Sequence, residues 1–314
     1  MWPPSREVAG HDQEDLVPMK TASHRHTTLR RATGALAALA ATGLAAGAAT
    51  SAPAVAAPTW APADQATITP GTQMYTDGAQ CTSNFVFTDA AANVYLGYAA
   101  HCAGMGAATD TNGCLNDSVP LGTEVTFRKG GSLISSGTEL GSGELAYSSW
   151  RTMRDIGTTD ENACAYNDFA LVKVDAADVS KVNPSIPFWG GPTGIDTDGT
   201  AAGDRVYSYG NSSLRAGLEP LSPKTGISLG DSAGDEGWSH PLYTVTPGVP
   251  GDSGSAFVSE DGEAIGTLST LGLAPLPASN NIGDLERELA FAQQHSGIAG
   301  LELALGTEPF SPLL

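Results

Sequence analysis

The sequence has few basic residues. Its 15 Lys and Arg stand against 34 Asp and Glu, which gives a formal net charge of −19. An acidic chain repels phosphate, so nucleic acid is excluded as an expected partner. Charged residues make up only 16% of the chain and hydrophobic residues 41%, so there is enough apolar material for a core and bulk disorder is excluded. The 38 Gly and 20 Pro follow no period, which excludes a collagen-like chain.

Cysteine is scarce, and no two cysteines form a Cys-x-x-Cys pair. The four are Cys81, Cys102, Cys114 and Cys164. The absence of a ligand cluster argues against a zinc site, and we expect no metal and no cofactor. An even number of cysteines in an exported chain predicts two disulfides. Four cysteines allow three pairings, and the spacing alone does not choose among them.

The first 56 residues are typical of a secretory signal peptide. Basic residues precede a weakly apolar stretch of mainly Ala, Leu, Gly and Thr over 32–49. Ala54-Val55-Ala56 then supplies small residues for cleavage. A transmembrane helix is disfavoured, because the stretch is poor in Leu and no basic stop follows it. We therefore expect a secreted, extracellular protein that does not associate with a membrane after cleavage. A start at Met19 is the alternative, since residues 1–18 make the basic region unusually long.

Short β-type runs recur between turns rich in Gly, Asn, Asp and Pro in the rest of the chain. Together with the high Gly content they predict an all-β fold. Strands are expected at 84–87, 94–98, 124–127, 169–174, 205–209, 242–245, 255–258 and 264–268. One helix is predicted over 283–294, because Ile282, Leu285 and Leu289 share one face. The final tail, 297–314, has no clear pattern.

Histidine is the scarcest candidate for a general base. After residue 56 only His101, His240 and His295 remain, and a base that works near neutral pH is usually a histidine. His101 lies in Ala99-Ala100-His101-Cys102, directly after a predicted strand. His240 stands in a turn-like context and His295 just past the predicted helix, so both are expected at the surface.

Two further segments supply partners for His101. Asp168 opens the apolar run Asp168-Phe169-Ala170-Leu171, and Ser253 stands among glycines in Gly251-Asp252-Ser253-Gly254. A serine hydroxyl is a poor nucleophile until a base removes its proton, and an acid can hold the imidazole in the useful tautomer. Base, acid and nucleophile in the order His, Asp, Ser therefore predict hydrolysis through a catalytic triad.

These segments resemble the chymotrypsin-like (trypsin-like) serine proteases, and most of all the secreted bacterial branch that includes the streptogrisins. The family pattern of Ala-Ala-His-Cys, Asp-x-Ala-Leu and Gly-Asp-Ser-Gly is met at 99–102, 168–171 and 251–254. The resemblance extends from about Cys81 to Gln294. It implies two six-stranded antiparallel β-barrels with a C-terminal α-helix, and a serine endopeptidase that forms an acyl-enzyme.

The resemblance also implies the domain organisation. Residues 57–80 would form an N-terminal segment, and 81–185 the first barrel with His101 and Asp168. Residues 186–280 would form the second barrel with Ser253, and 281–314 the helix and tail. The boundary between the barrels falls in the Pro-containing connector 182–187.

Further roles follow from the resemblance. The backbone N–H groups of Gly251 and Ser253 would form the oxyanion hole. Cys81 would pair with Cys102, which leaves Cys114 with Cys164. The acid that precedes the nucleophile, Asp252, would be buried and paired. Because the chain shows no Ile-Val-Gly-Gly start, an internal arginine is the expected partner, with Arg205 and Arg215 as candidates.

The substrate pocket departs from the trypsin pattern. Pro247 stands six residues before Ser253, where trypsin-like members carry an acid, so basic side chains are disfavoured. No histidine lies in 264–271, which weakens a preference for glutamate. The expected pocket is apolar and includes Pro247, Ser269 and Leu271, and Ser269 also resembles the family serine that supports the triad acid. The expected partner is a peptide or protein substrate, and the enzyme is expected to be a monomer.

Two other functions compete with this interpretation. One is a serine esterase of another fold, which carries a Gly-Asp-Ser string near its N-terminus and its base in an Asp-x-x-His string. Here the Gly-Asp-Ser string stands late in the sequence, and no histidine after the signal peptide has an Asp three residues before it. The Gly-x-Ser-x-Gly elbow also fails, because residue 255 is Ser. The alternative from a different class is a non-catalytic binding protein that retains the protease fold.

Overall fold

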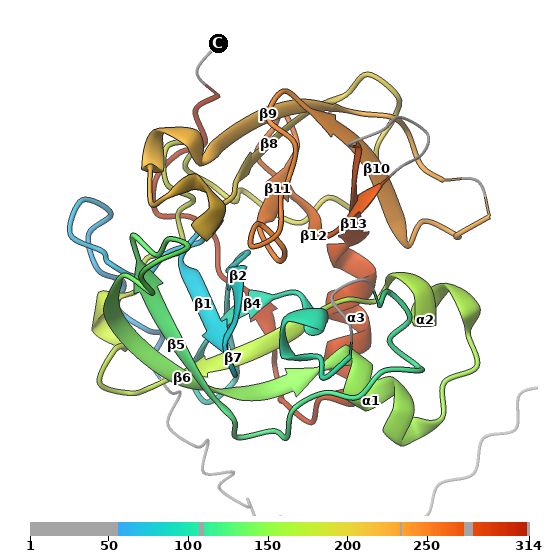
Figure 1. The fold of residues 1–314 in the computed structure, drawn as a ribbon, viewed down its shortest axis with the longest axis horizontal. Coiled ribbons are helices and arrows are strands. Elements are labelled where there is room, and N and C mark those ends of the chain that lie inside the picture. Colours follow the sequence, from blue (N-terminus) through green and yellow to red (C-terminus); the bar gives the residue numbers. More distant parts are fainter. Residues whose placement is uncertain (1–55, 107–109, 233, 273–278, 313–314) are drawn as a thin grey trace, which may run out of the picture. The chain divides into compact units, whose positions relative to one another are not determined.

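The chain is described here by a computed structural model over residues 56–106, 110–232, 234–272 and 279–312. The predicted signal peptide and the alternative start at Met19 lie outside these residues, apart from Ala56. Two antiparallel β-structures follow one another along the chain, and Figure 1 shows the first below the second.

The first β-structure is an eight-stranded antiparallel sheet with the order β14-β3-β4-β7-β6-β5-β1-β2. Its strands are β1 (Gln73–Thr76), β2 (Ala79–Thr82), β3 (Val86–Thr88), β4 (Val94–Tyr98), β5 (Glu124–Lys129), β6 (Thr138–Ser148), β7 (Ala170–Val174) and β14 (Glu302–Leu303). The predicted first barrel begins at residue 81, after an N-terminal segment over 57–80. β1 lies inside that segment and β2 crosses its end, so the sheet begins earlier than predicted.

This sheet is rolled up by the short link between β2 and β3. The two strands lie toward opposite ends of the sheet, yet only residues 83–85 separate them. Ser83 N donates to Thr72 O (2.9 Å) beside β1, and Asn84 N donates to Gly97 O (2.8 Å) on β4. The link of residues 83–85 is thus hydrogen-bonded to the β1 side of the sheet and to the β4 side, and it joins the two. With β2 and β3 counted as one bent strand, six strands form the ring, as the resemblance implies, and β14 is added at the outside.

The second β-structure is a closed barrel with the order β10-β13-β12-β11-β8-β9. Its strands are β8 (Arg205–Tyr209), β9 (Pro223–Ser228), β10 (Ser239–Thr244), β11 (Ala256–Val258), β12 (Ala264–Gly272) and β13 (Ser279–Asp284). Its apolar core is small and consists of Val206, Leu242, Phe257, Ile265, Leu268 and Ile282. Strands β9 and β13 are rich in polar residues, which is why no strand is predicted there from the sequence.

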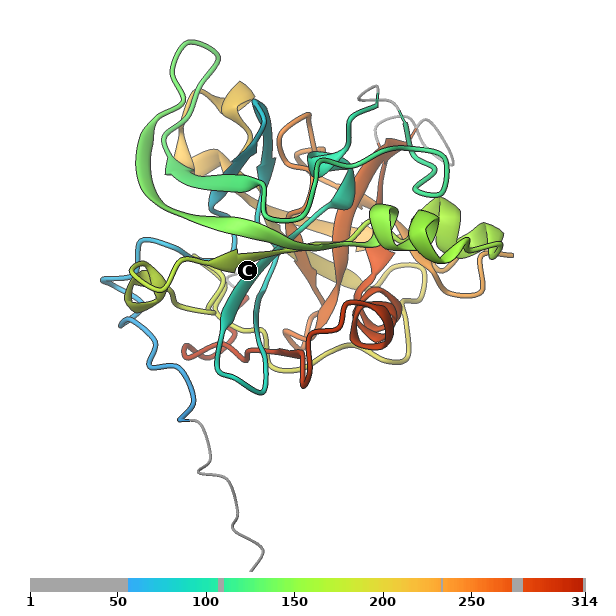
Figure 2. The ribbon, with the colours of Figure 1, turned by 90° about the horizontal axis from the view of Figure 1, so that it is seen from below.

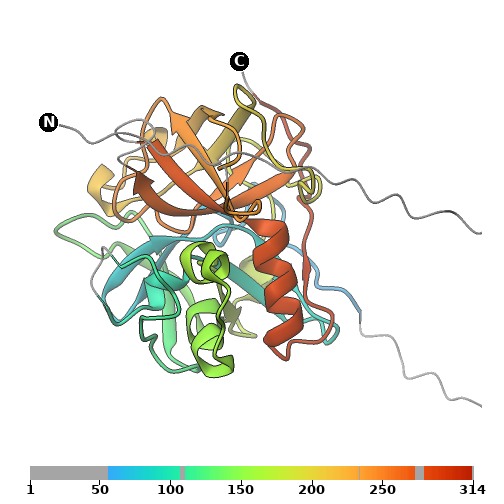
Figure 3. The same ribbon diagram turned by 90° about the vertical axis from the view of Figure 1, so that its right-hand side faces the viewer.

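Among the residues that the structure describes, three α-helices lie beside the two β-structures: α1 (Ser149–Ile156), α2 (Glu161–Tyr166) and α3 (Leu285–His295). Only α3 is predicted from the sequence, and it buries Leu285 and Leu289 as expected. Asp284 caps it, because its Oδ1 accepts from Arg287 N (2.9 Å). Figure 3 shows α3 against the second barrel and next to α1. Within the described residues, no helix has the length and hydropathy needed to cross a membrane.

The two β-structures share an apolar cluster, which fixes them against each other. Phe87 and Phe169 from the first structure belong to the same buried cluster as Tyr207 and Ala256 from the second. The rings of Phe87 and Phe169 meet edge to face at 5.4 Å between centroids. Residues of one barrel are therefore held at a defined position relative to residues of the other.

The C-terminal tail, for which the sequence shows no pattern, is ordered and contacts both β-structures (Figure 2). β14 pairs with β3, with Glu302 opposite Thr88. Further along, the ring of Phe310 packs on Tyr207 of the second barrel, with 5.6 Å between centroids. The tail therefore adds a strand to one barrel and packs against the other.

Both expected disulfides are present. Cys81–Cys102 joins β2 to the short 3₁₀ helix η1 (Ala100–Ala103), and its Cα atoms are 6.2 Å apart. Cys114–Cys164 joins the loop after η1 to α2, with Cα atoms 5.1 Å apart and a sequence separation of 50. The first constrains the segment that carries His101, and the second ties down the insertion before Asp168.

Replacing Cys114 and Cys164 together by Ser should lower the free energy of unfolding by about 4 kcal/mol, because a loop of this length regains entropy in the unfolded chain. Urea unfolding followed by circular dichroism measures this difference. Ser135→Ala, in an exposed turn, serves as the control and should leave the midpoint unchanged. An unchanged midpoint in the double cysteine variant would contradict the stabilising role of this bridge.

Candidate active site

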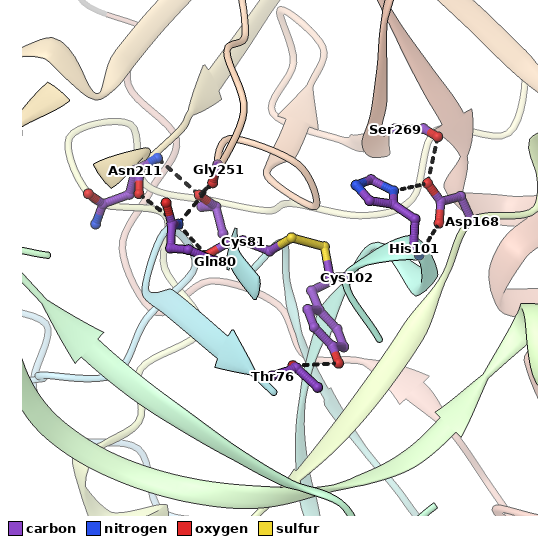
Figure 4. The surroundings of a disulfide bond; sticks show 11 residues. Thr76, Gln80, Cys81, His101, Cys102, Asp168, Asn211, Gly251 and Ser269 are labelled. Carbon is purple, nitrogen blue, oxygen red and sulfur yellow. Dashed lines mark hydrogen bonds and ion pairs between the residues drawn. A yellow bond between two sulfur atoms is a disulfide. The ribbon is translucent and has the colours of Figure 1, made fainter. Parts of the chain in front are cut away.

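Asp168 holds His101 by both its main chain and its ring. η1 follows β4 directly, and this places His101 N within hydrogen-bonding distance of Asp168 Oδ1 (2.8 Å). The ring nitrogen Nδ1 lies 2.6 Å from Asp168 Oδ2 (Figure 4). An ionised carboxylate only accepts hydrogen bonds, so Nδ1 carries the proton and Nε2 is left as the basic atom.

Asp168 is buried, with 3% of its surface exposed, and receives a third hydrogen bond from Ser269 Oγ (2.6 Å). Burial by itself raises the pKa of Asp168, but the charge of His101 and the hydrogen bonds from His101 and Ser269 outweigh it and hold the pKa below its usual value. Burial lowers the pKa of His101, but the charge and hydrogen bond of Asp168 prevail and raise it. Both shifts favour the ionised acid beside an imidazole that is easily protonated.

Ser253 lies in the turn before β11, between two glycines with positive φ. Gly251 has φ +96° and Gly254 has φ +88°, a conformation that favours glycine. A Cβ at Gly254 would also stand 2.5 Å from the backbone oxygen of Thr82, so a larger residue does not fit there. Thr82 N of the first barrel donates to Ser253 O (2.8 Å), which ties the turn across the interface.

The hydrogen bonds of this turn leave two N–H groups available. Asp252 N donates to Val249 O and Gly254 N to Leu268 O, whereas the N–H groups of Gly251 and Ser253 have no acceptor among the described residues. Ser212 Oγ donates to Pro250 O (2.6 Å). Because the carbonyl and the N–H of one peptide point in opposite directions, this bond turns the N–H of Gly251 away from Ser212.

Five of the predicted site residues line one cavity of about 580 Å³: His101, Asp168, Gly251, Ser253 and Ser269. In the described part of the chain, no hydrogen bond joins the Ser253 hydroxyl to the imidazole. Catalytic hydrogen bonds are often long without substrate and tighten when it binds. The structure thus brings the three triad candidates to the same cavity, with the His101–Asp168 pair already formed.

Two predicted pocket residues are placed differently. Pro247 does not line the cavity; the neighbouring Gly248, Val249 and Pro250 do. The carbonyl of Pro247 instead faces Lys224 Nζ (3.5 Å), behind the wall. Leu271 belongs to β12, but its side chain lies outside the described part.

Asp252 is fully buried and has two cationic partners. Arg215 binds both of its oxygens, with 2.6 Å between Nη2 and Oδ2. Of the two candidate arginines, Arg215 is thus the partner, and Arg205 is exposed at the start of β8. The second cation is Lys224 on β9, whose Nζ lies 3.0 Å from Asp252 Oδ2. Sequence reasoning missed Lys224, because a lysine in a polar strand gives no sign of burial.

The two cations fix the loop that carries the available N–H groups. Lys224 Nζ also approaches Thr246 O (3.4 Å), so its three protons face the carboxylate and two carbonyls. Burial lowers the pKa of Lys224, and Asp252 opposes this shift. One carboxylate and two cations leave an excess of positive charge behind the 246–252 loop. This arrangement needs no newly cleaved N-terminus to pair with Asp252.

Glu288 on α3 is a second residue that the sequence does not reveal. It is fully buried, and its Oε1 accepts from Asp168 N (3.2 Å). Burial raises the pKa of Glu288 well above its usual value, and the charges of Asp168 and Asp284 add to this, which favours the neutral acid. It shares a helix face with Leu285, and this acid on an apolar face was the one available signal.

His240 is not at the surface, contrary to the prediction. It lies on β10 with 1% of its surface exposed. Its Nδ1 is 2.8 Å from Asp231 Oδ1 and its Nε2 is 2.9 Å from Asp284 Oδ2. The prediction failed because the turn-like context is in fact a strand that pairs with β13. His295 is also misplaced: it is the last residue of α3 and lies half-buried against Phe291.

Potential metal ligands come together at one point in the described ranges, where Cys81, His101 and Cys102 offer atoms within 4.8 Å of one another. The two sulfurs form a disulfide, and His101 Nδ1 is bound to Asp168. Sulfurs in a disulfide are not thiolate ligands, so this group is not suited to a metal.

Comparisons with known proteins give only distant similarity. No family model matches the sequence, and no curated protein matches it. Among solved structures, Thermobifida fusca protease A is 17% identical with a TM-score of 0.46, over 76% of this chain and 99% of the other. Nocardiopsis protease is 18% identical with a TM-score of 0.42, over 75% of this chain and 98% of the other. Cellulomonas bogoriensis chymotrypsin is 15% identical with a TM-score of 0.40, over 76% of this chain and 98% of the other.

His240 makes the stability of the protein depend on pH. Burial lowers the pKa of His240, but the hydrogen bonds and charges of Asp284 and Asp231 outweigh it and raise the pKa. A raised pKa stabilises the fold below the unfolded value of about 6.5, and this stabilisation is lost as pH rises through the folded value. His240→Gln should therefore cost about 2 kcal/mol at pH 5.5 and less at pH 9.

Urea unfolding of both proteins at several pH values tests this. Exposed Ser135→Ala is the control and should show no pH-dependent difference from the unmodified protein. A cost of His240→Gln that grows with pH would contradict the assignment of a protonated imidazole between two carboxylates.

Proposed function

We propose that the protein is a secreted serine endopeptidase that cleaves peptide bonds through Ser253, His101 and Asp168. One observation carries the proposal: the His101–Asp168 pair, the Ser253 hydroxyl and the two available N–H groups meet at a single cavity. Nucleophile, base, orienting acid and oxyanion donors are the complete set that acyl transfer requires. The two disulfides support export, since such bonds persist in oxidising compartments.

The reaction follows from the positions of these groups. His101 Nε2 takes the proton of the Ser253 hydroxyl as its oxygen attacks the substrate carbonyl, and Asp168 stabilises the imidazolium. The N–H groups of Gly251 and Ser253 donate to the oxyanion, and each such donor is worth about 3–4 kcal/mol in the transition state. His101 then gives the proton to the leaving amine, which leaves an acyl group on Ser253. Water repeats the cycle and releases the acid.

The finer expectations belong to the same proposal. The first barrel, expected over 81–185 but with strands from Gln73 onward, would supply base and acid. The second barrel, expected over 186–280 but with β13 ending at Asp284, would supply the nucleophile, and the helix and tail that follow would hold both. Gly248, Val249 and Leu268 line the cavity and would favour apolar side chains over Lys and Arg. The enzyme would act as an extracellular monomer on peptides or proteins.

A fluorophosphonate probe should label the protein secreted by a host that expresses the full chain, and Ser253→Ala should abolish the label. Ser255→Ala is the matched control two residues away, because the buried Ser255 hydroxyl has no partner in the described structure; it should still be labelled. Folded protein that takes no label would instead indicate a binding protein. Labelled protein that cleaves small esters but no peptide would indicate an esterase.

Peptide hydrolysis should rise with pH, because only neutral imidazole accepts the serine proton. Since Asp168 raises the pKa of His101, the midpoint of kcat/KM should lie above 6.5. Asp168→Asn should lower kcat by about 10⁴-fold and move the midpoint downward. Steady-state kinetics from pH 5 to 9 measures both effects. A flat profile between pH 5 and 8 would rule out His101 as the base.

A further inference from the structure

Asn280 places a polar group in the wall of the candidate substrate pocket. It lies on β13, only 1% of its surface is exposed, and it lines the same cavity as Ser253. The surrounding wall is formed by Gly248, Val249 and Leu268, none of which has a polar side chain. Among these neighbours the Asn280 amide is the one polar side chain, and Ser269 and Thr270 of β12 add hydroxyl groups elsewhere in the same cavity.

The orientation of this amide is fixed by its neighbours. Asn280 Oδ1 accepts from Gly248 N (2.8 Å). A backbone N–H can only donate, so the atom that faces Gly248 N must be the oxygen. The nitrogen Nδ2 points the other way, and it has no acceptor among the described residues. A nearly buried donor without a partner is costly, and a bound ligand could satisfy it.

The surroundings of Nδ2 place it at the wall. A Cβ built on Gly248 would lie 2.8 Å from Nδ2 and 2.9 Å from Leu268 Cδ2. The amide therefore occupies the space that a side chain at residue 248 would fill, next to an apolar leucine. Methylene groups of a substrate can pack on Leu268 while the end of its side chain reaches Nδ2.

The charge behind this wall has the opposite sign to that of trypsin-like pockets. Lys224 and Arg215 together outweigh Asp252, and Lys224 Nζ lies against the carbonyl of Pro247, the residue before Gly248. An excess positive charge in a buried setting repels a cationic side chain and tolerates a neutral or anionic one. A substrate acceptor, not a donor, fits this environment.

We propose that Asn280 selects substrates whose side chain before the scissile bond ends in a carbonyl oxygen, that is, glutamine or glutamate. This rests on the proposed function and names the substrate class of the same site: it keeps the exclusion of Lys and Arg and replaces the preference for purely apolar side chains. Nδ2 donates to the side-chain oxygen, and the methylenes lie on Leu268 and Val249. The sequence alone gave no sign of it, because Asn280 stands in the polar run 279–281, which is not predicted to be a strand.

The test is a series of otherwise identical peptide substrates with Gln, Glu, Met or Lys before the scissile bond. Met matches Gln in length but cannot accept a strong hydrogen bond, so kcat/KM for Gln or Glu should exceed that for Met by about tenfold. The Gln-to-Glu ratio decides which of the two side chains is the substrate. A value for Met or Lys equal to or above both would overturn the proposal, and this needs no variant protein.

Asn280→Asp changes the single atom in question, because its Oδ1 can still accept from Gly248 N while the donor becomes an acceptor. For this variant, the ratio of kcat/KM for the Gln peptide to kcat/KM for the Met peptide should fall from about ten to one or below. The kcat/KM for the Lys peptide should rise. Asn281→Asp is the matched control, since neighbouring strand residues face opposite sides and Asn281 does not line the cavity; its ratio should stay near ten. A ratio that stays near ten in Asn280→Asp would overturn the assignment.

Fluorophosphonate labelling of Ser253 in the same preparations distinguishes failure of the Asn280 proposal from failure of the proposed protease function. Full labelling together with a preference for Met or Lys would contradict the role of Asn280 but would still support the proposed protease function. Loss of labelling in folded, unmodified protein removes the protease, and with it the selection by Asn280.

Discussion

The buried carboxylate of Asp168 is the point on which the rest of the site depends. It accepts hydrogen bonds from His101 of the first barrel and from Ser269 of the second, and its own N–H donates to Glu288 of α3. A buried anion is stable only when it is paired and hydrogen-bonded. The fold therefore has to bring three elements together around one residue, and the shared apolar cluster between the barrels holds them there.

The turn that carries Ser253 depends on a second buried carboxylate, Asp252. Two cations surround it, and its main-chain neighbours receive their hydrogen bonds from the first barrel: Gly251 O accepts from Thr82 Oγ1 (2.7 Å) and from Gln80 Nε2 (3.0 Å), as Figure 4 shows for Gln80. Each barrel thus completes the part of the site that lies on the other. A change in the packing of the two barrels would disturb His101 and the two candidate oxyanion donors at the same time.

The sequence predicts the parts of this structure that local patterns encode. The three tetrapeptides gave the residues that meet at the cavity, and alternating apolar runs gave strands such as β4, β8 and β12. Strands β9 and β13 could not be predicted, because their polar side chains are stabilised by partners far away in the chain. Lys224, for example, is buried against Asp252, 28 positions further on, and no local pattern encodes that pairing.

The error about His240 has the same cause as the failure to see Asn280. Both lie inside a barrel whose apolar core is small, so polar networks rather than apolar packing define much of its interior. In such a barrel nearly every buried polar group must find a partner, since each one left without costs about 1–3 kcal/mol. His240 meets this condition with two carboxylates. Asn280 meets it only with its oxygen, and the remaining donor faces the cavity that contains Ser253. Ser208, Ser255 and Asn281 of this barrel also have a buried side-chain atom without a partner among the described residues. Asn280 differs from these three because it lines the cavity that contains Ser253, and the partner of its Nδ2 is expected to come from the substrate.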